Sequence, residues 1–183
     1  FGLSREFMLP LRTFRGYEID PLIGVVSAHS DLTEGEVAVV QVLFQPVRHP
    51  WAESMLRAVL DHEGKSFFAD APEIAAAAKT KIAHPLLAAL VRIGVKSPDL
   101  GRAWEIARAV GGSLRSFANP AGNEFMPLTN DGYEDGEHES DLLLRKSRRS
   151  GMILSTEELI SLVHPPSSSV RVEKLKREDR KTR

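Results

Sequence analysis

Two segments of the chain have the residue pattern of long β-strands. Glu36–Val47 is apolar on both parities apart from two glutamines, and Leu86–Lys96 has one parity that is apolar throughout. The less apolar parities of the two segments carry the long polar side chains Gln41, Gln45, Arg92 and Lys96. Because one face of an antiparallel sheet can lack a covering layer, these four positions predict a sheet face that is uncovered or meets a partner.

Two further segments predict weaker strands. Leu3–Arg12 alternates imperfectly between apolar and polar residues, and its Pro10 favours an edge strand because proline cannot donate a ladder hydrogen bond. Gly122–Thr129 predicts a short strand that Pro127 weakens in the same way.

Helical patterns fill the intervals between the predicted strands. A short helix is predicted over residues 20–30, with a proline at its first position. Pro50–Asp61 predicts an amphipathic helix, and Ala71–Ile82 predicts a second helix whose charges are ordered to suit the helix dipole. Pro98–Phe117 predicts the longest helix, because its apolar residues keep spacings of three and four.

In chain order, these elements are strand, helix, strand, two helices, strand, long helix and strand. Without the two-helix segment the order is βαββαβ, which predicts an α+β, ferredoxin-like fold with one four-stranded antiparallel sheet. Both helices of that arrangement cover the same face of the sheet. The predicted core domain spans residues 1–129 and contains the helical insertion at about residues 50–83.

The composition changes after this predicted domain. Residues 130–150 are rich in charge and predict a linker. Residues 151–166 predict a strand followed by a helix, in which Ser155 and Glu158 have the spacing of a capping box and two prolines end the helix. Residues 167–183 are a basic tail that we expect to be disordered in isolation.

The overall composition is typical of a soluble globular domain. Apolar residues make up 42% and charged residues 27% of the 183 positions, enough for one sizeable core. The net charge of −1 excludes a whole-chain attraction to nucleic acid. The absence of cysteine excludes disulfides and fits a reducing compartment, and no stretch predicts a membrane helix. The start, Phe1-Gly-Leu-Ser-Arg, lacks an initiator methionine and a signal pattern, which favours an excised domain.

The sequence contains no recognisable catalytic, cofactor or metal motif. Gly64-Lys65-Ser66 lacks the first glycine of a phosphate-binding loop and the strand that should precede it. The acidic stretch from Asp131 to Asp141 meets only part of the calcium-loop pattern and predicts a solvated loop, whose acids could contact the basic cluster Arg145–Arg149. The six histidines have no zinc-binding spacing. We therefore predict no catalytic residue, cofactor or metal in this chain.

Two basic clusters are the candidate nucleic-acid contacts. They consist of Arg145, Lys146, Arg148, Arg149, Lys174, Lys176, Arg177, Arg180 and Lys181. These side chains could neutralise phosphates, but acids are interspersed in the tail and no aromatic residue there can stack on a base. A solvated linker is therefore the favoured interpretation of the tail.

Two motifs resemble the N-terminal region of conjugation and type IV secretion ATPases of the TraG/HerA/FtsK-like class. One is the run Gly151-Met-Ile-Leu-Ser-Thr-Glu-Glu-Leu-Ile-Ser-Leu-Val-His-Pro-Pro, and the other is Gly35-Glu-Val-Ala-Val-Val-Gln-Val-Leu-Phe-Gln-Pro followed by Trp51. The resemblance is diffuse and extends from about Asp20 to Leu175.

The resemblance implies a ring-forming motor that moves DNA or protein and carries its nucleotide site further downstream. Because the ATPase core is absent from these 183 residues, no family active-site residue carries over. The implied role is a non-catalytic assembly module that contacts other subunits of a homo-oligomer. Its implied location is the cytoplasm. If the parent assembly is attached to the membrane, the implied location is the inner face of that membrane. The alternative is a DNA-binding adaptor that uses the basic clusters.

Overall fold

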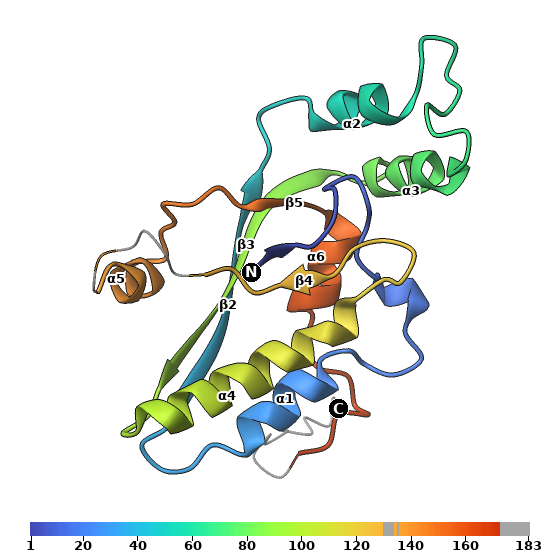
Figure 1. The fold of residues 1–183 in the computed structure, drawn as a ribbon. Helices are drawn as coiled ribbons and strands as arrows, with labels where there is room; N and C mark the ends of the chain where they lie inside the picture. The colour runs from blue at the N-terminus through green and yellow to red at the C-terminus, as the bar shows by residue number, and fades with distance from the viewer. Residues whose placement is uncertain (130–133, 135, 173–183) are drawn as a thin grey trace, which may run out of the picture.

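The computed structural model describes residues 1–129, 134 and 136–172. Within them the chain forms a mixed α+β fold with two antiparallel sheets and six α-helices (Figure 1). The larger sheet has the strand order β2-β3-β5, where β2 is Val37–Pro46, β3 is Leu86–Lys96 and β5 is Met152–Ser155. The two long strands predicted from the sequence are therefore confirmed, with boundaries that differ by one residue or less.

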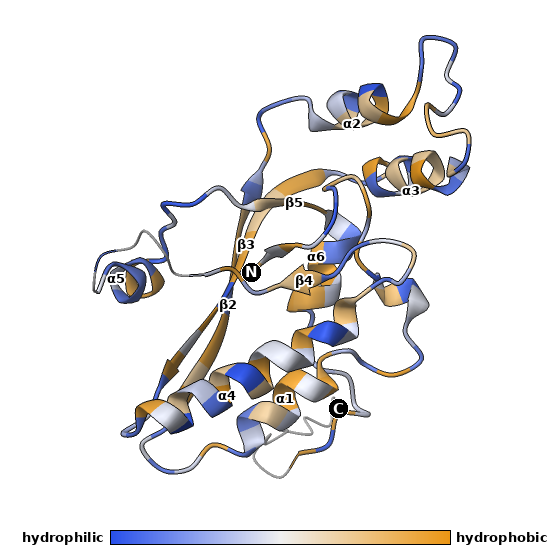
Figure 2. Ribbon diagram, in the orientation of Figure 1, coloured by the Kyte–Doolittle hydropathy of each residue, from blue (hydrophilic) through white to orange (hydrophobic). Residues whose placement is uncertain are grey.

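The two long strands pair along their whole length. The register runs from Val37 opposite Lys96 to Pro46 opposite Leu87, so the expectation that they are neighbours in one sheet is confirmed. On the other edge of β3, β5 pairs with Leu86–Ala89. The C-terminal strand is thus part of the main sheet, and Figure 2 shows that both β3 and β5 are predominantly apolar.

The smaller sheet contains only β1 (Gly2–Leu3) and β4 (Phe125–Met126). The predicted strands over Leu3–Arg12 and Gly122–Thr129 were therefore much too long. The backbone after Leu3 finds other partners: the amide of Leu11 donates to the Glu158 carboxylate and that of Arg12 donates to the carbonyl of Phe117. Side-chain and loop acceptors thus replace the ladder that the alternation suggested.

This pairing divides the expected strands between two sheets, so one four-stranded ferredoxin-like sheet is not confirmed. In a ferredoxin-like fold the first strand would lie beside the third. Here β5 occupies that edge of β3 at Leu86–Ala89, and the first strand reaches it only through the amino group of Phe1, which donates to the carbonyl of Val91 at 2.8 Å. A strand from the C-terminal segment has taken the place that sequence order assigned to the N-terminus.

Two helices pack together below the sheet in Figure 1: α1 (Ile23–Ser30) and α4 (Leu100–Ser113). The Asp99 carboxylate caps α4 by accepting from the amide of Arg102, and the helix continues as the 3-10 turn η2 (Leu114–Phe117). Side chains from the N-terminal segment, η2, the two sheets and α6 form the main core. This core comprises Leu11, Ala89, Val91, Leu114, Phe117, Phe125, Met152, Leu154 and Leu162.

The connection between β2 and β3 contains α2 (Trp51–Val59) and α3 (Pro72–Ile82), which project from the opposite end of the sheet to α1 and α4 (Figure 1). Both helices follow the sequence prediction closely. They share a second, smaller core with the N-terminal segment and the start of β3. Its buried members are Met8, Met55, Val59, Ala75, Ala78 and Leu86.

The C-terminal segment adds α5 (Glu137–Leu144) and α6 (Thr156–Val163). The predicted capping box of α6 is confirmed: the Ser155 hydroxyl accepts from the amide of Glu158, and the Glu158 carboxylate accepts from the amide of Ser155. The helix ends directly before His164, Pro165 and Pro166, as the prolines require.

Candidate functional site

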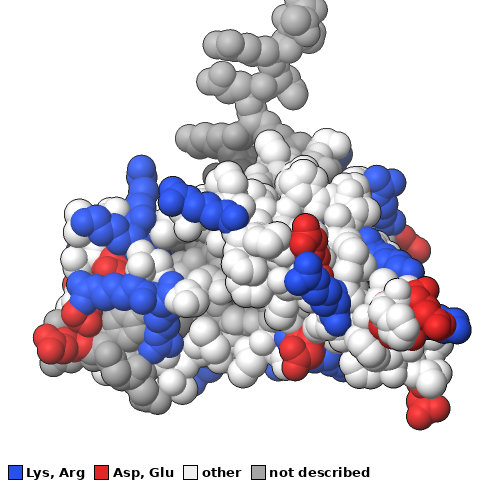
Figure 3. All heavy atoms as spheres, turned by 90° about the horizontal axis from the view of Figure 1, so that it is seen from above, with Lys and Arg blue, Asp and Glu red and all other residues white. Residues whose placement is uncertain are grey.

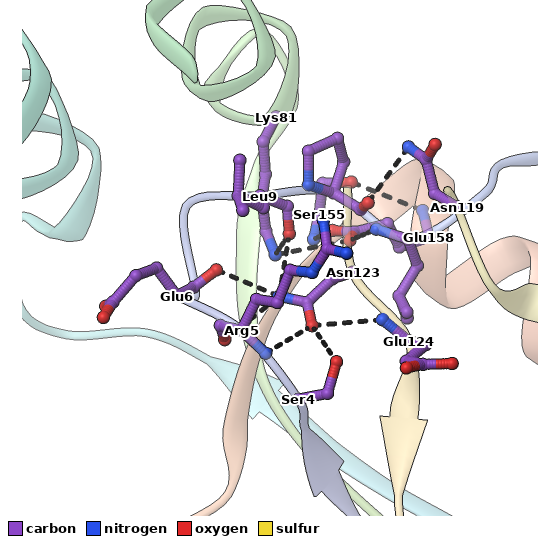
Figure 4. A network of polar contacts seen from close by, with 12 residues as sticks. Ser4, Arg5, Glu6, Leu9, Lys81, Asn119, Asn123, Glu124, Ser155 and Glu158 are labelled. Atoms are coloured by element: carbon purple, nitrogen blue, oxygen red, sulfur yellow. Dashed lines mark hydrogen bonds and ion pairs between the residues drawn. The ribbon is translucent and has the colours of Figure 1, made fainter. Parts of the chain in front are cut away.

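A buried ion pair joins the projecting helices to the C-terminal helix. The ammonium of Lys81, on α3, lies 3.3 Å from the carboxylate of Glu158, on α6, and neither side chain is exposed (Figure 4). Glu158 also accepts from the amides of Leu11 at 2.7 Å and Ser155 at 2.6 Å. Three separate parts of the chain therefore meet at one carboxylate.

The burial of this pair shifts the pKa of Lys81. Desolvation lowers the pKa of the Lys81 ammonium, and the negative charge of Glu158 opposes that shift. A lysine with a lowered pKa is a common feature of catalytic sites. Here, however, no solvent reaches either side chain, and the acceptor oxygens of Glu158 are already bonded to backbone amides. We conclude that the pair is structural.

Asn123 is the second centre of the same buried region (Figure 4). Its side-chain oxygen accepts from the amides of Arg5 at 3.0 Å and Glu124 at 3.1 Å. Its side-chain nitrogen donates to the carbonyls of Glu6 at 2.9 Å, Arg5 at 3.2 Å and Leu9 at 3.3 Å. One side chain thus replaces a strand partner for the irregular N-terminal segment.

The sequence reasoning found Glu158 through its capping box but missed Lys81 and Asn123. Lys81 occupies a late helix position, where a lysine also suits the helix dipole, so nothing local marked it as buried. For Asn123 the available signal was its place after Gly122 in a turn. A Cβ atom at Gly122 would collide with the carbonyl oxygen of Pro10, so the two backbones approach unusually closely there.

The predicted polar face of the sheet is partly covered by the chain itself. Gln41 and Arg92 lie opposite each other on β2 and β3, and the Arg92 guanidinium donates to the Gln41 side chain at 2.7 Å. Gln41 donates to the carbonyl of Leu142, and Arg92 donates to the carbonyls of Asp141 and Lys146. α5 and the residues after it therefore cover the middle of this face.

The other two predicted face residues lie away from that cover. Gln45 and Lys96 are exposed near opposite ends of the paired strands. Gly94 marks the boundary of the covered region, because a Cβ atom there would collide with the side chain of Leu142. A glycine inside a predicted strand is a sequence signal for such close approach.

The basic cluster after α5 is engaged with its own acidic neighbours. Arg148 forms ion pairs with Glu137 and, at 3.3 Å, with Asp141, which confirms the predicted contact between the acidic stretch and the cluster. Arg149 donates to the carbonyl of Thr129. Arg145 has a left-handed backbone, with φ of 54°, that ends α5.

An arginine that is already paired with two acids, as Arg148 is, contributes little to binding a polyanion. On the face seen in Figure 3, basic side chains gather at the left of the view, with acidic side chains among and below them. The tail positions that were predicted as nucleic-acid contacts lie outside the described residues. They are Lys174, Lys176, Arg177, Arg180 and Lys181.

In the described part of the chain, the outer edge of β2 is a free edge of the main sheet. Among the described residues, no strand pairs with the outer edge of β2, and this strand carries no charged side chain along its ten residues. Val37, Val39 and Phe44 are 55%, 39% and 55% exposed. Natural proteins usually protect such an edge with charges, bulges or a covering segment. β2 therefore has the features of a strand that receives a partner.

An open cleft of about 270 Å³ lies at the base of the projecting helices. It is formed where β2 leads into α2 and where α3 leads into β3. Its lining is mostly apolar and comprises Val47, His49, Pro50, Trp51, Ala52, Ile82, Ala83, His84, Pro85 and Leu86. Beside it, the Glu157 carboxylate lies 3.2 Å from the His84 ring and 2.9 Å from the Arg15 guanidinium. In the described part of the chain, no group of three or more His, Cys, Asp or Glu side chains is placed to hold a metal ion.

At the far end of the main sheet, Glu36 and Arg102 fix the start of β2 against α4. The Arg102 guanidinium donates to Glu36 at 2.8 Å and to the carbonyl of Asp31 at 3.1 Å. The hydrogen bond from Arg102, together with one from the amide of Thr33, lowers the pKa of Glu36 to about 2. The same pair raises the pKa of Arg102.

This depressed pKa predicts an acid-sensitive contribution to stability. The contribution is complete above the ordinary value of 4.5 and is lost as the pH falls through about 2, because the unfolded carboxylate takes up its proton first. We therefore expect Glu36→Gln to destabilise the protein at neutral pH and to match the wild type at the acidic end of that window. Urea unfolding across the window measures the difference, and a pH-independent difference would contradict the assignment.

Comparisons with protein-family models, curated proteins and solved structures found no match to the chain. Of the helices in the described ranges, none is both long and apolar enough to span a bilayer.

Proposed function

We propose that this chain is a non-catalytic assembly module of a DNA-translocating or conjugative type IV secretion-like ATPase. In this proposal its partners are neighbouring subunits of the same assembly, located in the cytoplasm or at the inner face of the membrane. The observation that carries the proposal is the uncharged edge of β2, which no described strand pairs with, and its exposed valines and phenylalanine.

An open sheet edge leaves backbone hydrogen-bonding groups without protein partners. An unpaired strand exposes a row of amide and carbonyl groups, and pairing them with a second strand also buries the apolar side chains beside them. The rest of the sheet is rigid support: β3 pairs with β2 over its full length, and β5 and α6 are fixed by the buried carboxylate of Glu158. The edge is therefore preorganised to receive a strand without refolding.

The sequence motifs support the parentage within this proposal. The two runs that resemble the translocase N-terminal regions form β2 and the β5–α6 unit, which lie on the two sides of β3 in one sheet. We also retain the ferredoxin-like relationship as a proposal, because the pairs β1–β4 and β2–β3 both occur in that fold.

The β2 edge gives a direct test. We expect the double substitution Val37→Lys and Val39→Lys to abolish concentration-dependent self-association, since charges on an edge strand oppose pairing. Both valines are on the surface, so the free energy of unfolding should change by no more than about 0.5 kcal/mol. Sedimentation velocity over a concentration series measures the association, and Ile19→Lys, at an exposed apolar position in the loop before α1, is the matched control.

Two results would count against the proposal. One is a wild-type chain that stays monomeric, or associates equally well after the β2 substitutions. The other is ATP turnover by the purified chain, which would place catalysis within these residues.

A further inference from the structure

The loop at the tip of the projecting helices presents two adjacent phenylalanines to solvent. Phe67 is 60% exposed and Phe68 is 42% exposed, although phenylalanine is usually a core residue. Their exposure is built into the loop. The amide of Phe67 donates to the carbonyl of Val59, and the amide of Phe68 donates to the hydroxyl of Ser66.

The remainder of the tip is held by its own hydrogen bonds. Asp61 accepts from the amides of Glu63 and Lys65, and Leu60 forms an isolated bridge with Ser66. Gly64 has φ of 78°, a left-handed conformation that glycine adopts at little cost and that turns the chain here. The two phenyl rings therefore stand on an ordered turn, which limits the entropy lost when they bind.

A cleft at the base of the same two helices has a shape that could receive an aromatic side chain. The cleft between the start of α2 and the end of α3 has a volume of about 270 Å³ and apolar walls that include Trp51, Ile82 and Leu86. An apolar cavity of about 150 Å³ is sufficient to hold a benzene molecule. The cleft is thus large enough for one phenyl ring.

The charges around the two features are opposite. Between residues 60 and 73 the tip carries the acids Asp61, Glu63, Asp70 and Glu73 against one lysine, Lys65, which is already paired with Glu63. The cleft is lined by His49 and His84, and the exposed Arg48 lies in the chain between the lining residues Val47 and His49. The carboxylate beside His84, that of Glu157, is already paired with Arg15. Bringing the tip to the cleft would set Asp70 and Glu73 against basic groups, which favours this contact over a tip-to-tip contact.

A tip cannot reach the cleft of its own chain. The two features lie at opposite ends of α2, whose nine residues span about 13 Å at 1.5 Å per residue. We propose that the exposed Phe67–Phe68 pair of one copy docks on the cleft of a second copy with one ring inserted, so that copies associate by a knob-and-cleft contact. This surface is separate from the β2 edge, so the inference does not depend on strand pairing at that edge.

The test uses two variants and a matched control. The knob variant is Phe67→Asp with Phe68→Asp, and the rim variant is Arg48→Glu with His49→Glu. The altered side chains are all exposed, so the fold should be retained, which circular dichroism verifies. The control is Leu100→Asp with Trp104→Asp, which removes an apolar pair from α4 that is more exposed than the knob pair.

We expect each variant alone to raise the dissociation constant for self-association at least about tenfold, while the control resembles the wild type. An equimolar mixture of the two variants should form heterodimers, because the intact knob of the rim variant fits the intact cleft of the knob variant. Sedimentation velocity with one variant fluorescently labelled measures this. Unchanged association in the knob variant, or a mixture that stays monomeric, would overturn the inference.

The same measurements separate this inference from the proposed function. Association that is lost after the β2 substitutions and kept in the knob variant would remove the knob-and-cleft contact and leave the assembly module in place. Association that is lost in the knob variant and kept after the β2 substitutions would support the knob-and-cleft contact. It would also remove strand pairing at β2 as the basis of the proposed function.

Discussion

Replacement of Glu158 by alanine is expected to lower the free energy of unfolding by about 3–5 kcal/mol, the cost of leaving one member of a buried ion pair without its partner. The substitution leaves the Lys81 ammonium, which has no exposure to water, without its carboxylate partner. It also removes the acceptor for the amides of Leu11 and Ser155. Because a domain of this size has a total stability of about 5–15 kcal/mol, a loss of this size will leave a large unfolded fraction under mild denaturing conditions.

Two companion variants separate the charge from the hydrogen bonds. Glu158→Gln keeps an acceptor oxygen for a backbone amide but removes the charge that faces Lys81, so we expect an intermediate loss. Combining Glu158→Gln with Lys81→Met removes both charges and should recover part of that loss, since neutral replacement of a buried pair is often tolerated. Urea unfolding of the four proteins measures these differences. Equal stability of Glu158→Ala and the wild type would contradict the central role of this carboxylate.

Local sequence patterns predicted the elements whose burial and hydrogen bonds follow the periodicity of their own residues. The long strand over Leu86–Lys96 buries Ala89 and Val91 of the parity that the sequence marked as apolar, and the capping box at Ser155 is closed by residues three positions apart. In both cases the signal and the structure involve the same short segment. The second role of Glu158, as acceptor for Leu11 and partner of Lys81, depends on residues 147 and 77 positions away and left no local pattern.

The same reasoning explains the failures in sheet topology. The edge of β3 could accept either an N-terminal or a C-terminal strand, and sequence order favoured the former. The N-terminal segment is instead drawn away by side-chain acceptors, so β5 pairs at Leu86–Ala89. The covering of the polar sheet face by α5 was missed for a related reason, because the interpretation of residues 130–150 as a linker ignored the glycine at position 94.

The interaction surfaces were only partly predictable. The apolar character of β2 was clear from the sequence, but its position as a free edge follows from the pairing of β3 with β2 on one side and β5 on the other. The exposure of Phe67 and Phe68 also needed the tertiary fold. A pair of phenylalanines beside a turn is compatible with either a core or a surface position, and only the projection of α2 and α3 away from the main core decides between them (Figure 1).

Substitution of Asn123 by leucine is expected to cost about 3 kcal/mol or more of unfolding free energy. Leucine has a similar volume but no polar group, so the amides of Arg5 and Glu124 and the carbonyl of Glu6 lose their side-chain partner. Each buried polar group left without a partner costs about 1–3 kcal/mol. Because the N-terminal segment relies on this one amide in place of a strand ladder, the loss should be concentrated there.

Asn119→Ala is the matched control, since it removes the same side-chain type from the same loop. The Asn119 side chain donates to the carbonyl of Pro10 at 3.2 Å and accepts from the amide of Ala121 at 3.2 Å, so it satisfies fewer groups, and we expect a loss of about 1 kcal/mol. Urea unfolding gives the two totals, and hydrogen exchange of the Arg5 and Glu124 amides locates the effect. Exchange that accelerates equally in both variants, or uniformly over the whole chain, would show that Asn123 does not hold the N-terminal segment in place.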